Sequence, residues 1–215
     1  MTEAEWLASD NPGRLFEQVD GRVSARKVRL ALCGCLRSPQ VRALLTSKAS
    51  RRAVEVGEAF VEGAANLQEL AEARTNANAA ARRAWRKATS GLPAAYLANH
   101  VCLQDNNLLS YAYPLFSNYL RQLHPPAGLI RDVLGNPFQP PTKPSAWLVP
   151  SVVSIAQAAY EERALPSGEL DVARLAVLSD ALEEAGCSDD ILTHLRGPVP
   201  HVRGCWALDL LLGKG

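Results

Sequence analysis

The sequence predicts an all-α protein, and three observations support this prediction. Alanine and leucine are abundant, aromatic residues make up only 6% of the 215 residues, and valine and isoleucine are too scattered to form strand runs. Apolar residues recur at i, i+3 and i+4, and period-2 alternation over five or more residues is rare. We therefore expect a helical bundle-like single unit in which a proline-rich strap at about 123–150 connects two helical parts.

Helix-capping residues place the first elements of the N-terminal part, residues 1–122. Thr2 with Glu5 three residues later forms a capping box, and Pro12 suits the first turn of a second helix. Ser24 and Asn66 are expected to cap two longer helices. The expected helical segments of this part are 2–8, 12–19, 24–36, 50–63, 66–89, 94–103 and 106–121.

Proline marks the connector between the two parts. Seven of the fourteen prolines lie within 123–150, where one short helix at 127–134 is expected. The C-terminal part, residues 151–215, is expected to be helical again. The expected helices beyond the connector are 149–162, 171–185, a short segment that ends at Leu195, and 201–212. We expect both parts to pack as one domain.

Composition excludes several classes of protein. The net charge is +1, and no run approaches the roughly 18 apolar residues of a membrane-spanning helix. The first residues are acidic and no apolar segment follows them, so a secretory signal is not expected. Five cysteines, an odd number, fit reduced thiols better than a disulfide framework. These features predict a globular protein of the cytoplasm that makes no membrane contact.

Signatures of the common enzyme classes are absent from the sequence. The chain contains no G-x-S-x-G elbow, no Walker A loop, no dinucleotide-binding glycine motif and no H-E-x-x-H motif. We therefore expect no catalytic residue and a non-enzymatic function.

Positive charge is concentrated in the first half of the chain. Residues 1–90 contain 15 basic and 10 acidic side chains, whereas residues 91–215 contain 8 and 12. Part of this positive charge surrounds Trp85. The candidate binding residues of this basic face are Arg22, Arg26, Lys27, Arg29, Arg37, Arg42, Lys48, Arg51, Arg52, Arg82, Arg83, Arg86 and Lys87.

Three interpretations of this basic face remain open. Guanidinium groups on one face contact the phosphates of a nucleic acid and release counterions. The same residues would also suit the acidic face of a partner protein. Alternatively, they form solvated faces or pack against the acidic C-terminal third, which has nine acidic residues between 161 and 190.

Cysteines and histidines near the C-terminus form a candidate metal site. His201 and Cys205 are four residues apart, which would place both on one face of the expected last helix. Cys187 and His194 lie close by in the sequence, so a zinc site is one interpretation. The other is that the cysteines are small buried hydrophobic residues, because no C-x-x-C spacing is present. Apart from zinc in this site, no cofactor is expected.

The strap carries a candidate partner surface. Asn136 precedes Pro137, which favours an extended backbone. Phe138 and Trp147 either anchor the strap on the helical core or, together with these two residues, present an exposed surface to a partner.

Sequence words spread over nearly the whole chain carry a resemblance. The most specific are IRDVLGNPF at 130–138, LSDALEEAGC at 178–187, HVRGCW at 201–206 and DLLLGK at 209–214. They resemble a family of uncharacterised bacterial proteins that often occur as several paralogues in one large genome. Members tend to carry extra cysteines around 33–35 and directly after the match to His194, where this chain has Gly34, Leu36 and Leu195. No activity is established for that family, so the resemblance implies no mechanism.

These features together predict a non-enzymatic protein-interaction module, an accessory subunit of a bacterial cytoplasmic complex whose partner is another protein. A nucleic-acid-associated accessory protein that uses the same basic face is the first alternative. A protein stabilised by a Cys/His metal site is the second.

Overall fold

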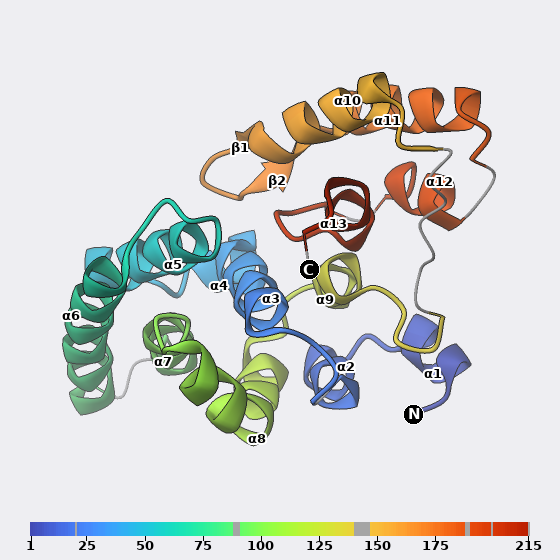
Figure 1. The fold of residues 1–215 in the computed structure, drawn as a ribbon. Coiled ribbons are helices and arrows are strands. Elements are labelled where there is room, and N and C mark those ends of the chain that lie inside the picture. The colour runs from blue at the N-terminus through green and yellow to red at the C-terminus, as the bar shows by residue number, and fades with distance from the viewer. Residues whose placement is uncertain (20, 88–90, 140–146, 188–189, 199, 215) are drawn as a thin grey trace.

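The computed structural model describes residues 1–19, 21–87, 91–139, 147–187, 190–198 and 200–214, with only the backbone at 105–107 and 109–114. Helices account for 68% of the chain, and thirteen of them lie in this described part. The segments β1 (Arg163–Ala164) and β2 (Glu169–Leu170) form a two-stranded antiparallel hairpin. The all-α class is therefore confirmed (Figure 1).

The first half of the chain is organised around one central helix. Its helices are α1 (Glu3–Ala8), α2 (Pro12–Gln18), α3 (Ala25–Arg37), α4 (Pro39–Arg42), α5 (Lys48–Val61), α6 (Leu67–Arg86), α7 (Leu92–His100), α8 (Asp105–Leu123) and α9 (Ala127–Leu134). The helix α3 packs against α5, α7, α8 and α9, and its residues 28–37 are all buried. A helix surrounded on all sides is a core element. The first hydrophobic core therefore forms around α3.

Capping boxes begin two helices of this half where the sequence indicates them. The hydroxyl of Thr2 accepts a hydrogen bond from the Glu5 N–H at 3.3 Å, and the Glu5 carboxylate accepts one from the Thr2 N–H at 2.8 Å. Asn66 and Glu69 form the same reciprocal pair before α6. Each box satisfies two N–H groups that a helix start would otherwise leave unpaired.

The second half has its own hydrophobic core. Its helices are α10 (Pro150–Glu161), α11 (Val172–Glu184), α12 (Asp190–Leu195) and α13 (Trp206–Leu212). Trp147, Tyr160 and Cys187 are buried among the apolar side chains of these helices. The helix α13 contacts both α10 and α9, so it lies between the two halves (Figure 1).

The strap is divided between the two cores. Its expected short helix is α9, which packs against α3 and α2 in the first core. Phe138 packs against the first core, whereas Trp147 is buried in the second. Residues 140–146 lie outside the described residues. The two aromatic residues of the strap therefore contact different cores.

A largely buried polar network joins the halves. Asp209 in α13 is 2% exposed and accepts hydrogen bonds from the Arg26 guanidinium at 2.7 and 3.2 Å. Arg26 also donates to Glu62 at 3.0 Å. The Glu62 carboxylate accepts from the Tyr160 hydroxyl at 2.7 Å and from Lys214 at 2.9 Å. Removal of one partner from such a network leaves an uncompensated buried charge, so these contacts fix how the halves dock.

The C-terminal segment differs from the helix predicted over 201–212. The helix α13 begins only at Trp206, because the residues before it pair with the hairpin. The Leu170 N–H donates to the His201 carbonyl at 2.8 Å, and Glu169 forms an isolated bridge with Val202. The short hairpin is not predicted either, since its two-residue strands are too brief for a periodic pattern.

The other helix boundaries lie within three residues of expectation, apart from the predicted end at residue 89, which is outside the described residues. Within the described part of the chain, none of the helices has the length and apolar character that crossing a membrane requires.

Candidate functional site

Four side chains with metal-ligating atoms meet where the two halves dock. We call Asp132, His194, His201 and Cys205 the metal cluster. Asp132 belongs to α9 and His194 to the last turn of α12, whereas the other two lie in the segment before α13. One ligand atom from each side chain can be chosen so that all four lie within 4.8 Å of one another.

The Asp132 carboxylate is the centre of the metal cluster. Its Oδ1 lies 2.7 Å from Nδ1 of His201 and 3.1 Å from Nε2 of His194. Its Oδ2 accepts a hydrogen bond from the Val202 N–H at 2.8 Å. The Cys205 Sγ lies 3.3 Å from Nε2 of His194 and 3.9 Å from Nδ1 of His201.

These separations can be compared with the edges of a tetrahedron around one ion. Zinc binds nitrogen and oxygen at about 2.0–2.2 Å and sulfur at about 2.3 Å, so the donors of a tetrahedral site are roughly 3.3–3.7 Å apart. Four separations in the cluster lie between 2.7 and 3.9 Å and the widest reaches 4.8 Å, so small side-chain shifts would place the four donors around one ion. Two imidazoles, a thiolate and a carboxylate are all donors that zinc accepts.

The metal cluster is largely shielded from water. The Asp132 side chain and Cys205 are fully buried, and the side chains of His201 and His194 are 3% and 14% exposed. Four protein donors in a buried position are typical of structural zinc sites, whereas catalytic sites keep one position open.

The ionisation of the cluster does not favour a cysteine nucleophile. Burial alone raises the pKa of Asp132, but hydrogen bonds to His194 and His201 outweigh burial and lower it below the ordinary value. Burial, helped by the charge of Asp132, raises the pKa of Cys205 well above its ordinary value. A buried thiol with a raised pKa reacts poorly, so this arrangement is not a typical thiol-hydrolase site.

His201 has one polar atom that its surroundings do not satisfy. Its Nε2 is buried and has no hydrogen-bond partner among the described residues. An unpaired polar atom of this kind costs about 1–3 kcal/mol. The other ring nitrogen, Nδ1, contacts Asp132 and Cys205 of the metal cluster. This orientation of the ring therefore makes the contacts within the cluster and leaves Nε2 without a hydrogen bond.

Lys27 holds together the two chain segments that carry most of the donors. Its Nζ donates to the carbonyl oxygens of Val133 at 2.9 Å and Gly204 at 2.8 Å, next in sequence to Asp132 and Cys205. The same ammonium group forms an ion pair with Asp209 at 2.7 Å. A residue of the predicted basic face therefore positions the metal cluster from inside the protein.

The turn before Cys205 requires glycine. Gly204 has a φ of +87°, and a Cβ at this position would lie 2.8 Å from Leu30 and 3.3 Å from Val133. Both the left-handed backbone and the close packing exclude a larger residue. The turn therefore lies directly on α3 and α9.

A cavity of about 460 Å³ opens beside the metal cluster. Its lining includes Trp6, Arg131 and Trp206, together with the cluster residues Asp132 and His194. The ring of Trp206 lies against that of His194, with centroids 4.8 Å apart. The cavity therefore gives an ion an entry path to two of the donors.

Three of the four cluster residues belong to the Cys/His site that the sequence predicts. His194, His201 and Cys205 come together, whereas Cys187 is buried in the second core outside the cluster. The expected helical i, i+4 geometry is wrong, because the turn before α13 brings His201 and Cys205 together. Asp132 is missed, although a carboxylate between apolar neighbours on the buried face of a short helix is a usable signal.

Four of the thirteen predicted basic contact residues point into the protein: Arg26, Lys27, Arg29 and Arg37. Arg29 is fully buried and donates to the carbonyls of Val101 and, at 2.8 Å, Leu103. Arg37 is 8% exposed and donates to Glu58 at 2.7 and 3.1 Å. The expectation of one exposed face is corrected for these four, because internal oxygen atoms already bind them.

Eight of the other nine gather at one end of the α5–α6 pair, and we call them the outer basic face: Arg42, Lys48, Arg51, Arg52, Arg82, Arg83, Arg86 and Lys87. A small pocket lined by Ser47 and Ser50 of one helix start and by Arg83 and Lys87 of the other helix end shows that these ends adjoin. Arg22 is exposed in the turn before α3. Part of the predicted basic face is therefore a real surface feature.

The strap residues do not form one exposed surface. Asn136 donates to the Glu3 carboxylate at 2.6 Å and accepts from the Phe138 N–H at 3.0 Å, and Pro137 is half-buried. Trp147 is 8% exposed within the second core. The anchoring interpretation of the two aromatic residues fits these positions, and Trp147 is not available to a partner.

No family model matches the chain, and neither a curated protein nor a solved structure matches it. Its function is therefore inferred from the geometry of its own side chains.

Proposed function

We propose that this protein is a zinc-stabilised, non-enzymatic interaction module, in which one ion at the metal cluster joins the two helical halves. The observation that supports this proposal is the convergence of four donor atoms within 4.8 Å at a buried position. Asp132 lies on a helix of the first core, whereas Cys205 is part of the second. An ion bound here would cross-link the halves, as structural zinc does in small domains.

The donor set favours a structural role over a catalytic one. Four protein donors complete a tetrahedral coordination, which leaves no position for substrate. The carboxylate of Asp132 and the thiolate of Cys205 would balance the charge of a divalent ion. The thiol must lose its proton when the ion binds, so binding releases acid.

The cysteines support a reducing compartment such as the cytoplasm. All five are buried thiols, and no disulfide joins them. Reduced thiols are usual where glutathione and thioredoxin operate. An accessory role in a cytoplasmic complex follows as part of the same proposal.

Metal content and stability test the zinc proposal. Protein purified without chelator is expected to contain about one zinc ion per chain by elemental analysis. A strong chelator is expected to lower its melting temperature, because the ion binds the folded state only. Cys205→Ala should lose the metal and the response to chelator.

Cys187→Ala is the matched control, since it removes a buried thiol of the second core that lies outside the metal cluster. It should lower stability and keep the metal. Protein that contains no metal, takes up no added zinc and melts identically with and without chelator would refute the proposal.

The outer basic face supports a second candidate function, the binding of an acidic partner or a nucleic acid. Its cations come from two segments that contain no Asp or Glu, 21–54 and 73–104, and Arg52 is paired with Glu55 just beyond the first. Trp85 within it is 63% exposed, which is unusual for so large an apolar side chain.

Salt dependence separates this candidate from a merely solvated surface. If the face binds DNA or RNA, affinity should fall steeply as salt rises, because counterions are released. Arg82→Glu with Arg86→Glu should abolish binding. If the protein binds neither DNA nor RNA at low salt, an acidic protein partner is the remaining interpretation. A pull-down from nuclease-treated lysate tests it.

A further inference from the structure

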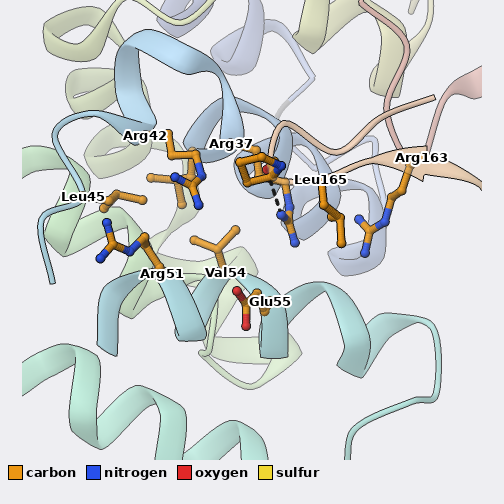
Figure 2. A pocket seen from close by; sticks show the side chains of 10 residues that line it. Arg37, Arg42, Leu45, Arg51, Val54, Glu55, Arg163 and Leu165 are labelled. Carbon is orange, nitrogen blue, oxygen red and sulfur yellow. Dashed lines mark hydrogen bonds between the residues drawn. The ribbon is translucent and has the colours of Figure 1, made fainter. Parts of the chain in front are cut away.

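A second, smaller pocket lies between the end of α3, the short helix α4, the start of α5 and the hairpin (Figure 2). Four arginines line it: Arg37, Arg42, Arg51 and Arg163. They come from four different elements, so the fold and not one charged helix face brings them together.

Two of these arginines share one internal carboxylate. Arg37 donates to one oxygen of the Glu58 carboxylate at 2.7 and 3.1 Å, and Arg163 contacts the other oxygen. A further nitrogen of Arg37 donates to the Pro166 carbonyl at 3.2 Å, which is the dashed line in Figure 2. These contacts hold one wall of the pocket rigid.

The other two have no such partner. Arg42 and Arg51 are half-buried, and their guanidinium groups make neither a hydrogen bond nor an ion pair with any residue that the structure describes. In Figure 2 they extend from α4 and α5 into the same space beside Leu45. Two half-buried guanidinium groups without an internal partner keep their N–H donors available to an anion that enters the pocket.

Charge in the pocket is not balanced. Four guanidinium groups face only the carboxylates of Glu58 and Glu55, which leaves an excess of two positive charges. Glu55 is in addition paired with Arg52 on the outside of α5, at 3.2 Å. Burial is the main cause that lowers the pKa of Arg163, and Glu58 opposes this shift.

Size and walls restrict what the pocket holds. Its volume is about 170 Å³, below the roughly 300–1,000 Å³ of sites that enclose drug-sized ligands. Leu36, Leu45, Val54 and Leu165 supply apolar walls. Apolar walls lower the local dielectric and strengthen charge–charge attraction.

We propose that this arginine pocket binds the phosphoryl group of a small phosphomonoester or free inorganic phosphate. A phosphoryl group carries a charge of about −1.5 to −2 at pH 7, which matches the excess, and its oxygens accept paired N–H bonds from guanidinium. Arg42 and Arg51 supply the free donors, and the Glu58-bound pair supplies a fixed positive background. This site does not depend on zinc.

Calorimetric titration at constant ionic strength tests the proposal with inorganic phosphate and O-phosphoserine as probes and acetate as the monovalent comparison. The wild-type chain should bind the phosphorylated probes and not acetate. Arg42→Gln with Arg51→Gln should weaken binding about tenfold or more, because each lost charged hydrogen bond lowers affinity by this order.

Arg14→Gln with Arg74→Gln is the matched control, because it removes the same charge from exposed positions that do not line the pocket. It should bind phosphate within about twofold of wild type. If the double variant Arg42→Gln with Arg51→Gln does not fold, the single variant Arg51→Gln replaces it in the titration. Circular dichroism checks that the single variant is folded.

The relative affinities of the two probes distinguish free inorganic phosphate from a phosphomonoester as the ligand. Equal binding of both probes supports free phosphate as a sufficient ligand, and tighter binding of phosphoserine supports a phosphomonoester whose organic part reaches the rim. Absence of binding to both probes at millimolar concentration overturns the proposal. Equal losses in the pocket variant and the control variant also overturn it, since they would indicate general attraction to a basic surface.

Discussion

Two groups of cations from the same basic half of the chain end in opposite environments. One group lies along α3 and binds internal oxygen atoms: Arg26, Lys27, Arg29 and Arg37. The other group, the outer basic face, lies at the end of α4, the start of α5 and the end of α6. The inner group forms hydrogen bonds and ion pairs with carboxylates and carbonyls of other elements of the fold. Density of positive charge in a sequence therefore predicts a basic surface only where no internal acceptor reaches it.

The difference follows from the position of α3. A central helix has no solvent-facing side, so its charged residues must find partners or would not be tolerated. Asp209 and Glu58 provide these partners from α13 and α5. At exposed positions of the outer basic face such as Arg82 and Arg86, water solvates the cation and no internal partner is required. Internal cations should thus matter for stability, and external ones for binding.

The largest effect is expected from Asp209→Asn. It leaves Arg26 and Lys27 without their shared carboxylate, which is 2% exposed, and should lower the free energy of unfolding by about 3–5 kcal/mol. Urea denaturation measures this loss. Asp180→Asn, which removes a surface partner of Arg196, is the control and should leave the unfolding midpoint nearly unchanged. Equal effects of the two variants would show that the inner network is not stabilising.

An intermediate effect on stability is expected when the Glu62 carboxylate is protonated at low pH. Burial raises the pKa of Glu62, but hydrogen bonds from Tyr160 and Lys214 and the charge of Arg26 lower it overall below its ordinary 4.5. A lowered pKa means that this carboxylate stabilises the fold above pH 4.5 and that the contribution disappears as the pH falls through the folded-state pKa.

Denaturation of Glu62→Gln between pH 6 and pH 3 checks this sign. The variant should be less stable than wild type near pH 6, and the difference should shrink as the pH falls. The exposed Glu184→Gln controls for the loss of one carboxylate. A difference that grows toward pH 3 would contradict the assignment.

The smallest effect on stability is expected from Arg82→Ala and Arg86→Ala. Both side chains are exposed near the end of α6, so each substitution should change the free energy of unfolding by no more than about 0.5 kcal/mol. Thermal unfolding measures it. A loss comparable to that of Asp209→Asn would erase the distinction between the inner and outer groups.

Local signals in the sequence predict the helices well and the contacts between them poorly. Capping residues and the Ala127–Leu134 apolar pattern give accurate boundaries, because they act within a few residues. The pairing of Arg26 with Asp209 joins positions 183 residues apart, and no local pattern encodes it. The same reason hides Asp132 from a search for Cys/His spacing, since it lies 62 and 69 positions from the two histidines it contacts.

Under the zinc proposal, that long sequence separation would make zinc a probe of assembly. The four donors can surround an ion only when the first core has formed and the C-terminal helices have docked on it, so the apparent affinity for zinc includes the free energy of docking. Competition with a chelator of known strength would then measure how tightly the two halves associate.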